Sequence, residues 1–389
     1  MDIEIGKGKT ARRAYGFDEI AIVPSRRTRD PQDVDISWRL GNLQLDLPLL
    51  ASALDAAVDP KTAGTIGKLG GLAVLNLEGL QTRYEDPGPI FEEIANLPGH
   101  KATRVMQELY AEPIKEELIF RRVQETKDRG VIAAASLTPQ NVERYHGAAI
   151  EAGLDVLVIQ GTVVSAEHVS RTTEPLNLME FIPRQNVPVI VGGCASYSTA
   201  LHLMRTGAVA VLVGVGPGRI CTTRGVLGVG VPQATAVADA AAARMRHYLE
   251  TGEYVNVIAD GGMRTGGDVA KAITCGADAV MLGSAFAKAE EAPGRGYSWG
   301  MATFHPTLPR GTRIKTNVTG TIEEILVGPA HENDGTRNLM GALRSSMATT
   351  GYQNIKEFQK AEVMIAPSLQ TEGKLEQRSQ GVGQGSSGA

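Results

Sequence analysis

The sequence is poor in cysteine, and the few that it has follow no metal-binding or disulfide pattern. Its 389 residues include three, Cys194, Cys221 and Cys275. No two of them form a Cys-X-X-Cys pair and no histidine cluster lies beside them, so the sequence indicates neither a structural zinc site nor a disulfide framework. Because Cys194 and Cys275 lie in apolar contexts, we expect them to pack as small hydrophobic residues.

A net positive charge and long apolar runs are also lacking. The formal net charge is -4 at pH 7, so the chain has no overall basic character that would point to nucleic acid as a partner. No run of about 18 apolar residues occurs, and the first residues lack the apolar core of a secretory signal. We therefore expect a soluble, cytoplasmic protein that binds neither nucleic acid nor membrane.

Short apolar runs, by contrast, recur along the chain. They cover residues 47–53, 71–76, 131–136, 156–160, 187–192, 209–213, 254–259 and 279–282. Continuous apolarity is typical of strands buried on both faces of a parallel sheet, and the segments between the runs have helical periodicity. Eight such units predict an α/β fold of the (β/α)8 TIM-barrel class. A doubly wound open sheet is the alternative, but no Gly-X-Gly-X-X-Gly follows the first strand.

The barrel is predicted to form a single catalytic domain over residues 47–365. Residues 1–46 precede the first strand and are expected to form an arm or cap over the bottom of the barrel. Residues 286–337 form a long excursion after the eighth strand, and long loops in compact domains are usually functional. Residues 366–389 end in a segment rich in Gln, Gly and Ser, which we expect to be disordered.

A glycine-rich turn with one thiol follows the sixth predicted strand, and residues 214–224 read GVGPGRICTTR. The C-terminal strand ends of a barrel carry its active site, so Cys221 is a candidate nucleophile. A lone cysteine is more often a buried packing residue, which is the alternative. The polar neighbours Thr222, Thr223 and Arg224 favour an activated thiol.

A phosphate site is predicted where the seventh and eighth strands end. Asp260, Gly261 and Gly262 follow the seventh strand, and Gly283 and Ser284 follow the eighth. Glycine amides and a helix N-terminus at these two loops bind phosphate in many barrels, although each loop alone is also an ordinary turn. The Asp260 carboxylate suits ribose hydroxyl groups.

A nucleotide held by these loops would extend its base across the barrel mouth towards the sixth strand. This geometry suggests covalent attack by Cys221 on an electrophilic ring carbon. Thr223 is placed to orient a water molecule or relay a proton, although threonine in a loop is more often a turn former.

At these residues the chain resembles the IMP dehydrogenase and GMP reductase family, from about residue 12 to 365. The resemblance rests on six segments, which are GFDEIAIVPS (16–25), PLLASALDAAV (48–58), GVGPGRICTTR (214–224), GVGVPQATAV (228–237), ADGGMRTGGDVAKAITCGADAVMLGS (259–284) and LRSSMATTGY (343–352). It implies that Cys221 adds to C2 of the purine of IMP, that hydride passes to NAD, and that the resulting thioimidate is hydrolysed to XMP, in guanine nucleotide biosynthesis.

The resemblance also implies a set of binding residues. Those for the substrate are Ser52, Arg219, Asp260, Gly261, Gly262, Gly283, Ser284, Gly300, Met301 and Ala302, of which the last three read the hypoxanthine. Those for NAD are Asp55, Gln160, Gly193 and Gly214. The backbone carbonyls of Gly216, Gly218 and Cys221 match a monovalent cation site, usually for potassium. Family barrels assemble as homotetramers or homo-octamers.

The chain departs from the family pattern at several places. Only about fifty residues separate Asn76 from Val131, so the regulatory CBS module of many family dehydrogenases is absent. Arg219 stands where the family has a phosphate-binding serine. Gln160 and Gly193 replace the usual aspartate and asparagine of the cofactor pocket.

The usual catalytic flap has also been shortened, to seven residues between Met301 and Pro309. Arg310 replaces the acidic residue or glutamine that the family places there, so we expect Arg310 or His305 to orient the hydrolytic water. Two alternatives to an IMP dehydrogenase remain. They are an NADPH-dependent GMP reductase and a weakly catalytic nucleotide-binding regulator. The dehydrogenase form of residues 281–284, ending in Ser284, argues against the reductase.

Overall fold

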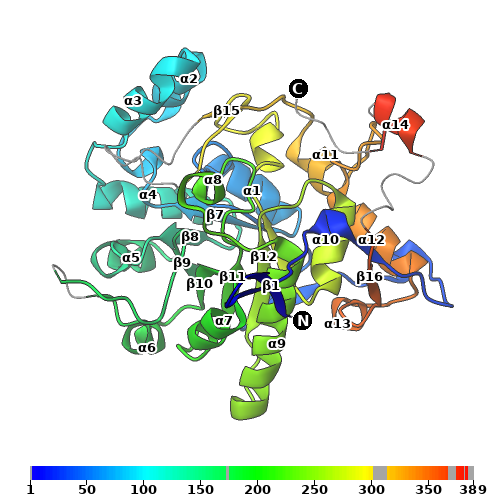
Figure 1. The fold of residues 1–389 in the computed structure, drawn as a ribbon. Coiled ribbons are helices and arrows are strands. Elements are labelled where there is room, and N and C mark those ends of the chain that lie inside the picture. The colour runs from blue at the N-terminus through cyan, green and yellow to red at the C-terminus, as the bar shows by residue number, and fades with distance from the viewer. Residues whose placement is uncertain (1, 172–174, 301–312, 367–373, 381, 384–389) are drawn as a thin grey trace.

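The computed structural model describes residues 2–171, 175–300, 313–366, 374–380 and 382–383 (Figure 1). Eight parallel strands form a closed barrel in the order of the sequence. They are β6 (Leu49–Ala51), β7 (Leu72–Asn76), β8 (Ala134–Leu137), β9 (Val156–Gln160), β10 (Val189–Cys194), β11 (Ala210–Val213), β12 (Asn256–Asp260) and β13 (Ala279–Leu282). The barrel closes where β13 pairs with β6, Met281 beside Leu50. The predicted (β/α)8 class is confirmed.

Helices cover the outside of the barrel. The principal ones are α1 (Pro60–Lys68), α4 (Glu116–Lys127), α5 (Val142–Glu151), α6 (Leu178–Phe181), α7 (Tyr197–Met204), α9 (Gln233–Thr251), α10 (Gly266–Thr274) and α12 (Leu339–Thr349). Side chains cap the N-termini of several of these helices. Asp59 accepts a hydrogen bond from the Thr62 amide ahead of α1, and Thr265 accepts one from the Asp268 amide at the start of α10. None of the described helices is long and apolar enough to cross a membrane.

The barrel interior is packed with side chains, and a hairpin covers its N-terminal end. The hairpin consists of β4 (Trp38–Leu40) and β5 (Leu43–Leu45). Trp38 packs with the interior residues Leu50 and Leu72, and its indole nitrogen donates to the Leu47 carbonyl at 2.9 Å. A filled interior leaves the opposite, C-terminal end of the strands for ligand binding.

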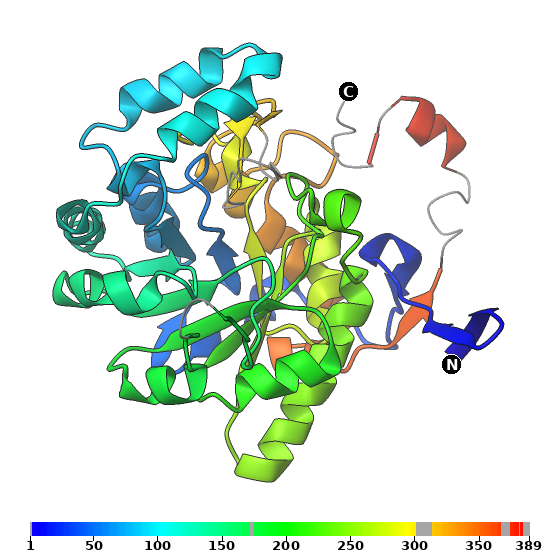
Figure 2. The same cartoon turned by 60° about the vertical axis from the view of Figure 1, so that its left-hand side comes forward.

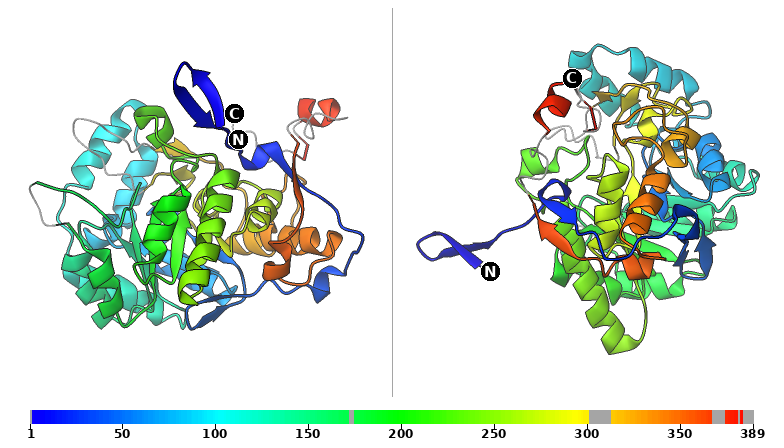
Figure 3. Two further views of the ribbon diagram at one scale, coloured as in Figure 1. Left: turned by 60° about the horizontal axis from the view of Figure 1, so that its bottom comes forward. Right: turned by 90° about the vertical axis from the view of Figure 1, so that its right-hand side faces the viewer.

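The N-terminal segment is not a single cap. Strands β1 (Asp2–Gly6) and β2 (Lys9–Arg12) form an exposed hairpin that projects from the body (Figure 3). Further on, β3 (Ile20–Ile22) pairs with β16 (Val363–Ile365). Phe17 and Asp18 lie at the C-terminal end of the barrel strands, where they line a cavity. Within residues 1–46, only the β4–β5 hairpin covers the N-terminal end of the barrel.

Two insertions lie side by side above the barrel (Figure 2). The first is a pair of helices after β7, α2 (Gly88–Asn96) and α3 (Gly99–Leu109). The second is the excursion after β13, with strands β14 (Tyr297–Ser298) and β15 (Ile314–Lys315) and helix α11 (Ile322–Leu326). Residues 77–133 are all described, and they contain no CBS module.

The remaining elements are short. The helical ones are η1 (Phe17–Glu19), η2 (Pro31–Asp33), η3 (Leu80–Thr82), η4 (Ile182–Arg184), η5 (Phe286–Lys288), α8 (Thr223–Leu227), α13 (Ile355–Phe358) and α14 (Leu375–Ser379). Helix α14 belongs to the segment that was expected to be disordered, so the described part of that segment contains regular structure.

Candidate active site

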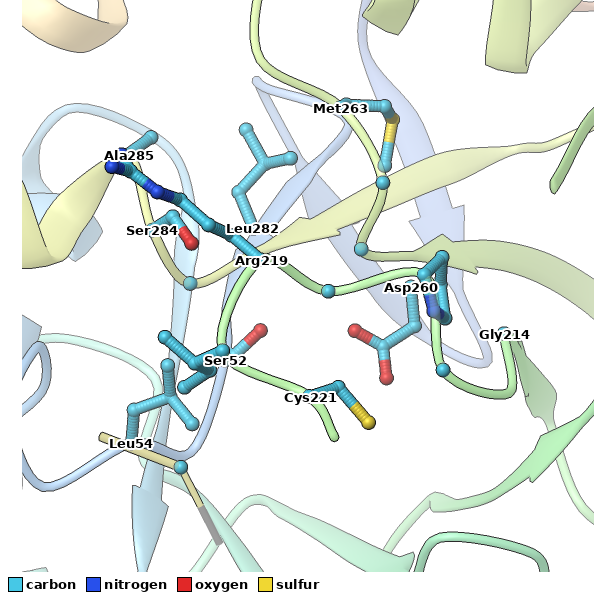
Figure 4. Close-up of a pocket in the computed structure, with 18 of the residues that line it drawn as sticks. Ser52, Leu54, Gly214, Arg219, Cys221, Asp260, Met263, Leu282, Ser284 and Ala285 are labelled. Carbon is cyan, nitrogen blue, oxygen red and sulfur yellow. The ribbon is translucent and has the colours of Figure 1, made fainter. Parts of the chain in front are cut away.

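A cavity of about 960 Å³ opens at the C-terminal ends of the barrel strands (Figure 4). Most of the residues singled out in the sequence line it. They are Ser52, Gln160, Gly214, Gly216, Gly218, Arg219, Cys221, Thr223, Asp260, Gly261, Gly262, Gly283, Ser284 and Gly300. The fold therefore brings together residues from the loops after β6, β9, β11, β12 and β13, which are far apart in the sequence.

The thiol of Cys221 faces this cavity. Cys221 is exposed, and its Sγ donates a hydrogen bond to the Oγ1 of Thr223 at 3.2 Å. The turn that presents it is closed by a hydrogen bond from the Cys221 amide to the Gly218 carbonyl at 3.0 Å, and Gly216 has a φ of +77°. The alternative of a buried packing cysteine is wrong for Cys221.

The other two cysteines have a different environment. Cys194 is buried within β10, and Cys275 is partly buried at the end of α10. Burial raises the pKa of each thiol to about 12. Both thiols stay protonated near neutral pH, as expected for packing residues, so they do not compete with Cys221 as nucleophiles.

Asp260 lies at the end of β12 with its carboxylate in the cavity. The Nε2 of Gln160 donates to its Oδ2 at 3.1 Å. Burial raises the pKa of Asp260 to about 7, and the bond from Gln160 opposes this shift. The Oε1 of Gln160 is buried and accepts no hydrogen bond from any described residue. A ligand with a donor group would satisfy it.

The loop after β12 requires glycine, and the loop after β13 is closely packed at its glycine. Gly261 and Gly262 have φ values of +75° and +82°, which side chains other than glycine rarely adopt. A Cβ on Gly283 would lie 2.5 Å from the Cδ1 of Leu54. Helix α10 begins four residues after Gly262. The backbone therefore approaches the cavity closely, as an anion site requires.

Three cationic side chains line the cavity beside these glycine loops. They are Arg219, Arg264 and Lys288. The pKa of Lys288 is lowered by burial and then by the positive charges of Arg219 and Arg264, while Asp334 opposes the shift. Like charges held together repel, so an anionic group bound among them would relieve that repulsion.

Sequence reasoning missed Arg264 and Lys288. The available signal was their position, because each follows one of the two predicted phosphate loops within a few residues. It also missed the wall on the far side of the cavity, which is formed by Thr138, Pro139 and Gln140 after β8 and by Gly161, Thr162 and Val163 after β9.

Two expected cofactor contacts do not line the cavity. Asp55 is 1% exposed, and its carboxylate accepts hydrogen bonds from the Leu80 amide and the Tyr110 hydroxyl. Gly193 lies inside β10, which extends further than predicted, and a Cβ there would lie 2.6 Å from the Gly214 carbonyl oxygen. Neither is available for direct contact with a ligand in this cavity, so both assignments are corrected.

Four further candidates lie outside the described residues. They are Met301, Ala302, His305 and Arg310. Their assignments stay predictions.

Fold and site together define a (β/α)8-barrel protein with an exposed thiol, glycine loops and cationic side chains in one cavity. The sequence model of the IMP dehydrogenase / GMP reductase domain matches residues 14–377. The chain therefore belongs to this family, which is one of oxidoreductases.

Individual relatives agree with this assignment. An uncharacterized oxidoreductase of Mycolicibacterium smegmatis is 45% identical, over 93% of this chain and 99% of its own length. The inosine-5'-monophosphate dehydrogenase of Methanocaldococcus jannaschii is 27% identical over 93% of this chain and 95% of its own. The crystal structure of an IMP dehydrogenase/GMP reductase-like protein from Corynebacterium glutamicum superposes with a TM-score of 0.89, at 45% identity over 94% of this chain and 97% of that one.

Proposed function

We propose that this protein oxidises IMP to XMP with NAD, through a covalent bond between Cys221 and the purine. One observation carries the proposal. The Cys221 thiol, hydrogen bonded to Thr223, lies in the same cavity as Asp260 and the glycine loops with their cationic side chains. A nucleotide monophosphate has an electrophilic base, a ribose and a phosphate that match these three features.

The phosphate is assigned to the amides of Gly262, Gly283 and Ser284, with Arg219 and Lys288 supplying charge. The Ser52 hydroxyl adds a further donor. Gly261 forms the turn between Asp260 and this site.

The ribose hydroxyl groups are assigned to the carboxylate of Asp260. The base then extends towards Cys221. The segment of Gly300, Met301 and Ala302 is assigned to the hypoxanthine, and of these Gly300 lines the cavity.

The reaction begins when the Cys221 thiol gives its proton to solvent and the sulfur bonds to C2 of the purine, while the C2–N3 π bond opens and N3 takes up a proton. NAD, when bound, accepts the hydride that leaves C2. Water then adds to the thioimidate carbon, the carbon–sulfur bond breaks, and XMP is released with the thiol restored. Thr223 orients the sulfur, as acceptor from the thiol and as hydroxyl donor to the thiolate, because Thr223 is buried and fixed at the start of α8.

Two features of the cavity lining support NAD as a second ligand. The far wall of the cavity, which includes Thr138 and Thr162, lies beyond the proposed purine position, and the unpartnered Oε1 of Gln160 suits the amide group of a nicotinamide. Gly214 lies on the same wall as Cys221. For a potassium ion, the carbonyls of Gly216, Gly218 and Cys221 are oxygen donors gathered in one tight turn, which is the donor type that a hard cation prefers.

Release of XMP needs an activated water, and we assign its orientation to Arg310 or His305. Replacing each by alanine is expected to leave a first turnover of NADH formation and to slow steady-state turnover. Unchanged steady-state rates in both variants would exclude the two residues. The family's assembly as a homotetramer or homo-octamer is likewise proposed, and sedimentation velocity tests it.

The experiment that tests the function follows NADH and XMP after the purified protein is mixed with IMP, NAD and potassium. Formation of both in equal amounts is expected. If the protein instead oxidised NADPH when GMP was supplied, with IMP as the product, it would be a GMP reductase. Tight IMP binding without any NADH, at every pH tested, would identify a regulatory nucleotide-binding protein.

A further inference from the structure

A chain of buried hydrogen bonds links three segments at the top of the barrel. The indole nitrogen of Trp299 donates to the hydroxyl oxygen of Tyr110 at 2.9 Å. The Tyr110 hydroxyl in turn donates to the Oδ2 of Asp55 at 2.6 Å, and the Leu80 amide donates to the same oxygen at 2.9 Å. One hydroxyl therefore acts as acceptor and donor at once, an arrangement in which each bond strengthens the other.

Both ends of this series of hydrogen bonds adjoin the cavity. Asp55 directly follows Leu54, which lines the cavity together with Ser52. Trp299 directly precedes Gly300, which belongs to the excursion after β13 and also lines the cavity. Tyr110 itself lies at the end of α3 and does not line the cavity.

The bonds between these groups are well protected. Trp299 is fully buried and packs in one apolar cluster with Leu80, Phe91 and Met106. The pKa of Tyr110 is raised well above its ordinary value by burial and then by the charge of Asp55, so its hydroxyl keeps the proton that it donates.

The helix pair α2–α3 holds the excursion at a second point. The Arg313 guanidinium donates to the carbonyls of Ile94, Ala95 and Leu97 at the end of α2, and it lies 4.0 Å from the centre of the Tyr297 ring. Carbonyls in the last turn of a helix lack a full set of helical partners, so Arg313 caps α2, although the Ile94 carbonyl also accepts a hydrogen bond from the Leu97 amide at 3.4 Å. The helix pair thus contacts the excursion at Trp299, just before Gly300, and again at Arg313.

We infer that Tyr110 is a positioning residue for the active site. Its hydroxyl joins the β6 loop, which carries Ser52 and Leu54, to the segment that brings Gly300 into the cavity. The inference rests on the proposed function, because it assigns these two segments to opposite parts of the same bound nucleotide. Loss of the hydroxyl would let them shift relative to each other, and displacements of about 1 Å can cost about 100-fold in rate.

The test replaces Tyr110 with phenylalanine, which keeps the ring and removes the hydroxyl. The matched control is Tyr84→Phe. Tyr84 packs against the same cluster, but its hydroxyl donates to the Leu109 carbonyl at 3.0 Å and not to Asp55. A second variant, Trp299→Phe, removes the indole N–H that donates to Tyr110 and keeps an aromatic ring.

Tyr110→Phe is expected to lower kcat/KM for IMP at least about tenfold relative to Tyr84→Phe, at a similar melting temperature. IMP affinity is measured separately, from the fluorescence of Trp299 in a Trp38→Phe background, where Trp299 is the single tryptophan. We expect IMP to change this emission, and Tyr110→Phe to weaken both the change and the affinity.

The outcomes separate the two claims. Equal IMP affinity and equal kcat/KM in Tyr110→Phe and Tyr84→Phe would overturn the positioning role and leave the proposed function intact. IMP binding without NADH would overturn the function, and the affinities would still decide the role of Tyr110. No IMP binding by the unaltered protein would overturn both.

Discussion

The thiol of Cys221 donates a hydrogen bond to the hydroxyl of Thr223 across 3.2 Å. Thr223 is 4% exposed, whereas Cys221 is open to the cavity. A buried hydroxyl on the first turn of α8 thus fixes the direction of an exposed nucleophile. The support for the nucleophile thus comes from the residue two positions further along the same turn.

Thr223→Val is therefore expected to lower kcat by about 10- to 100-fold, because valine keeps the shape of the side chain and loses the hydrogen-bonding oxygen. IMP affinity is expected to change little. Steady-state kinetics and equilibrium IMP binding check this. Thr222→Val is the matched control, and an equal loss in both variants would contradict a specific role for Thr223.

The Asp260 carboxyl has a pKa of about 7, above its ordinary value of 3.8, because it is buried. It binds its proton more tightly in the folded protein, so it favours folding at low pH, and this contribution is lost as the pH rises towards 7. Asp260→Asn removes this pH-dependent contribution. Relative to the unaltered protein, the variant should therefore be more stable at pH 8 than at pH 4. We expect this gain to be only about 1 to 2 kcal/mol, because the carboxyl also faces an open cavity.

Urea denaturation of both proteins at the two pH values measures this effect. The same titration predicts that IMP binds more tightly as the pH rises through about 7, since the ionised carboxylate accepts two hydrogen bonds from the ribose. A pH-independent difference in stability between Asp260→Asn and the unaltered protein would contradict the assignment.

The cations beside the glycine loops are expected to bind the phosphate. Arg219→Ala and Lys288→Ala should each raise the KM for IMP about tenfold or more, since a hydrogen bond to a charged group contributes about 1.5 to 3 kcal/mol. Raising the salt concentration should weaken IMP binding less in these variants than in the unaltered protein.

Arg184→Ala is the control for this pair, because Arg184 forms only an exposed ion pair with Glu180. If inosine, which has no phosphate, binds as well as IMP, the assignment of these side chains is wrong.

His247 on α9 is 2% exposed, and neither ring nitrogen has a hydrogen-bond partner among the described residues. An unpaired buried polar group costs about 1 to 3 kcal/mol. His247→Leu, which has a similar size, is expected to raise the free energy of unfolding by about 1 kcal/mol, measured by urea denaturation. A loss of stability would show that the imidazole has a partner or a shape that leucine cannot replace.

The barrel and most of its site could be predicted from the sequence, because continuous apolar runs mark buried parallel strands and the site residues follow their ends directly. Asp55 was misplaced for a physical reason. Asp55 also follows a strand end, but its carboxylate turns away from the cavity and accepts a hydrogen bond from the Tyr110 hydroxyl. Tyr110 lies at the end of an inserted helix pair, and no local sequence pattern reveals the position of that pair. Arg264 and Lys288 were missed because their side chains meet at the cavity only when the loops after β12 and β13 pack together.

The most direct test of the account is to stop a reaction of the protein with IMP and NAD by acid, digest the protein, and determine by mass spectrometry which residue carries a purine nucleotide. We predict an adduct with the oxidised nucleotide on Cys221, none on Cys194 or Cys275, and none when NAD is omitted. Cys221→Ser should form no NADH while it still binds IMP. NADH and XMP formation at an unchanged rate in Cys221→Ser, or an adduct on another residue, would contradict the covalent role of Cys221.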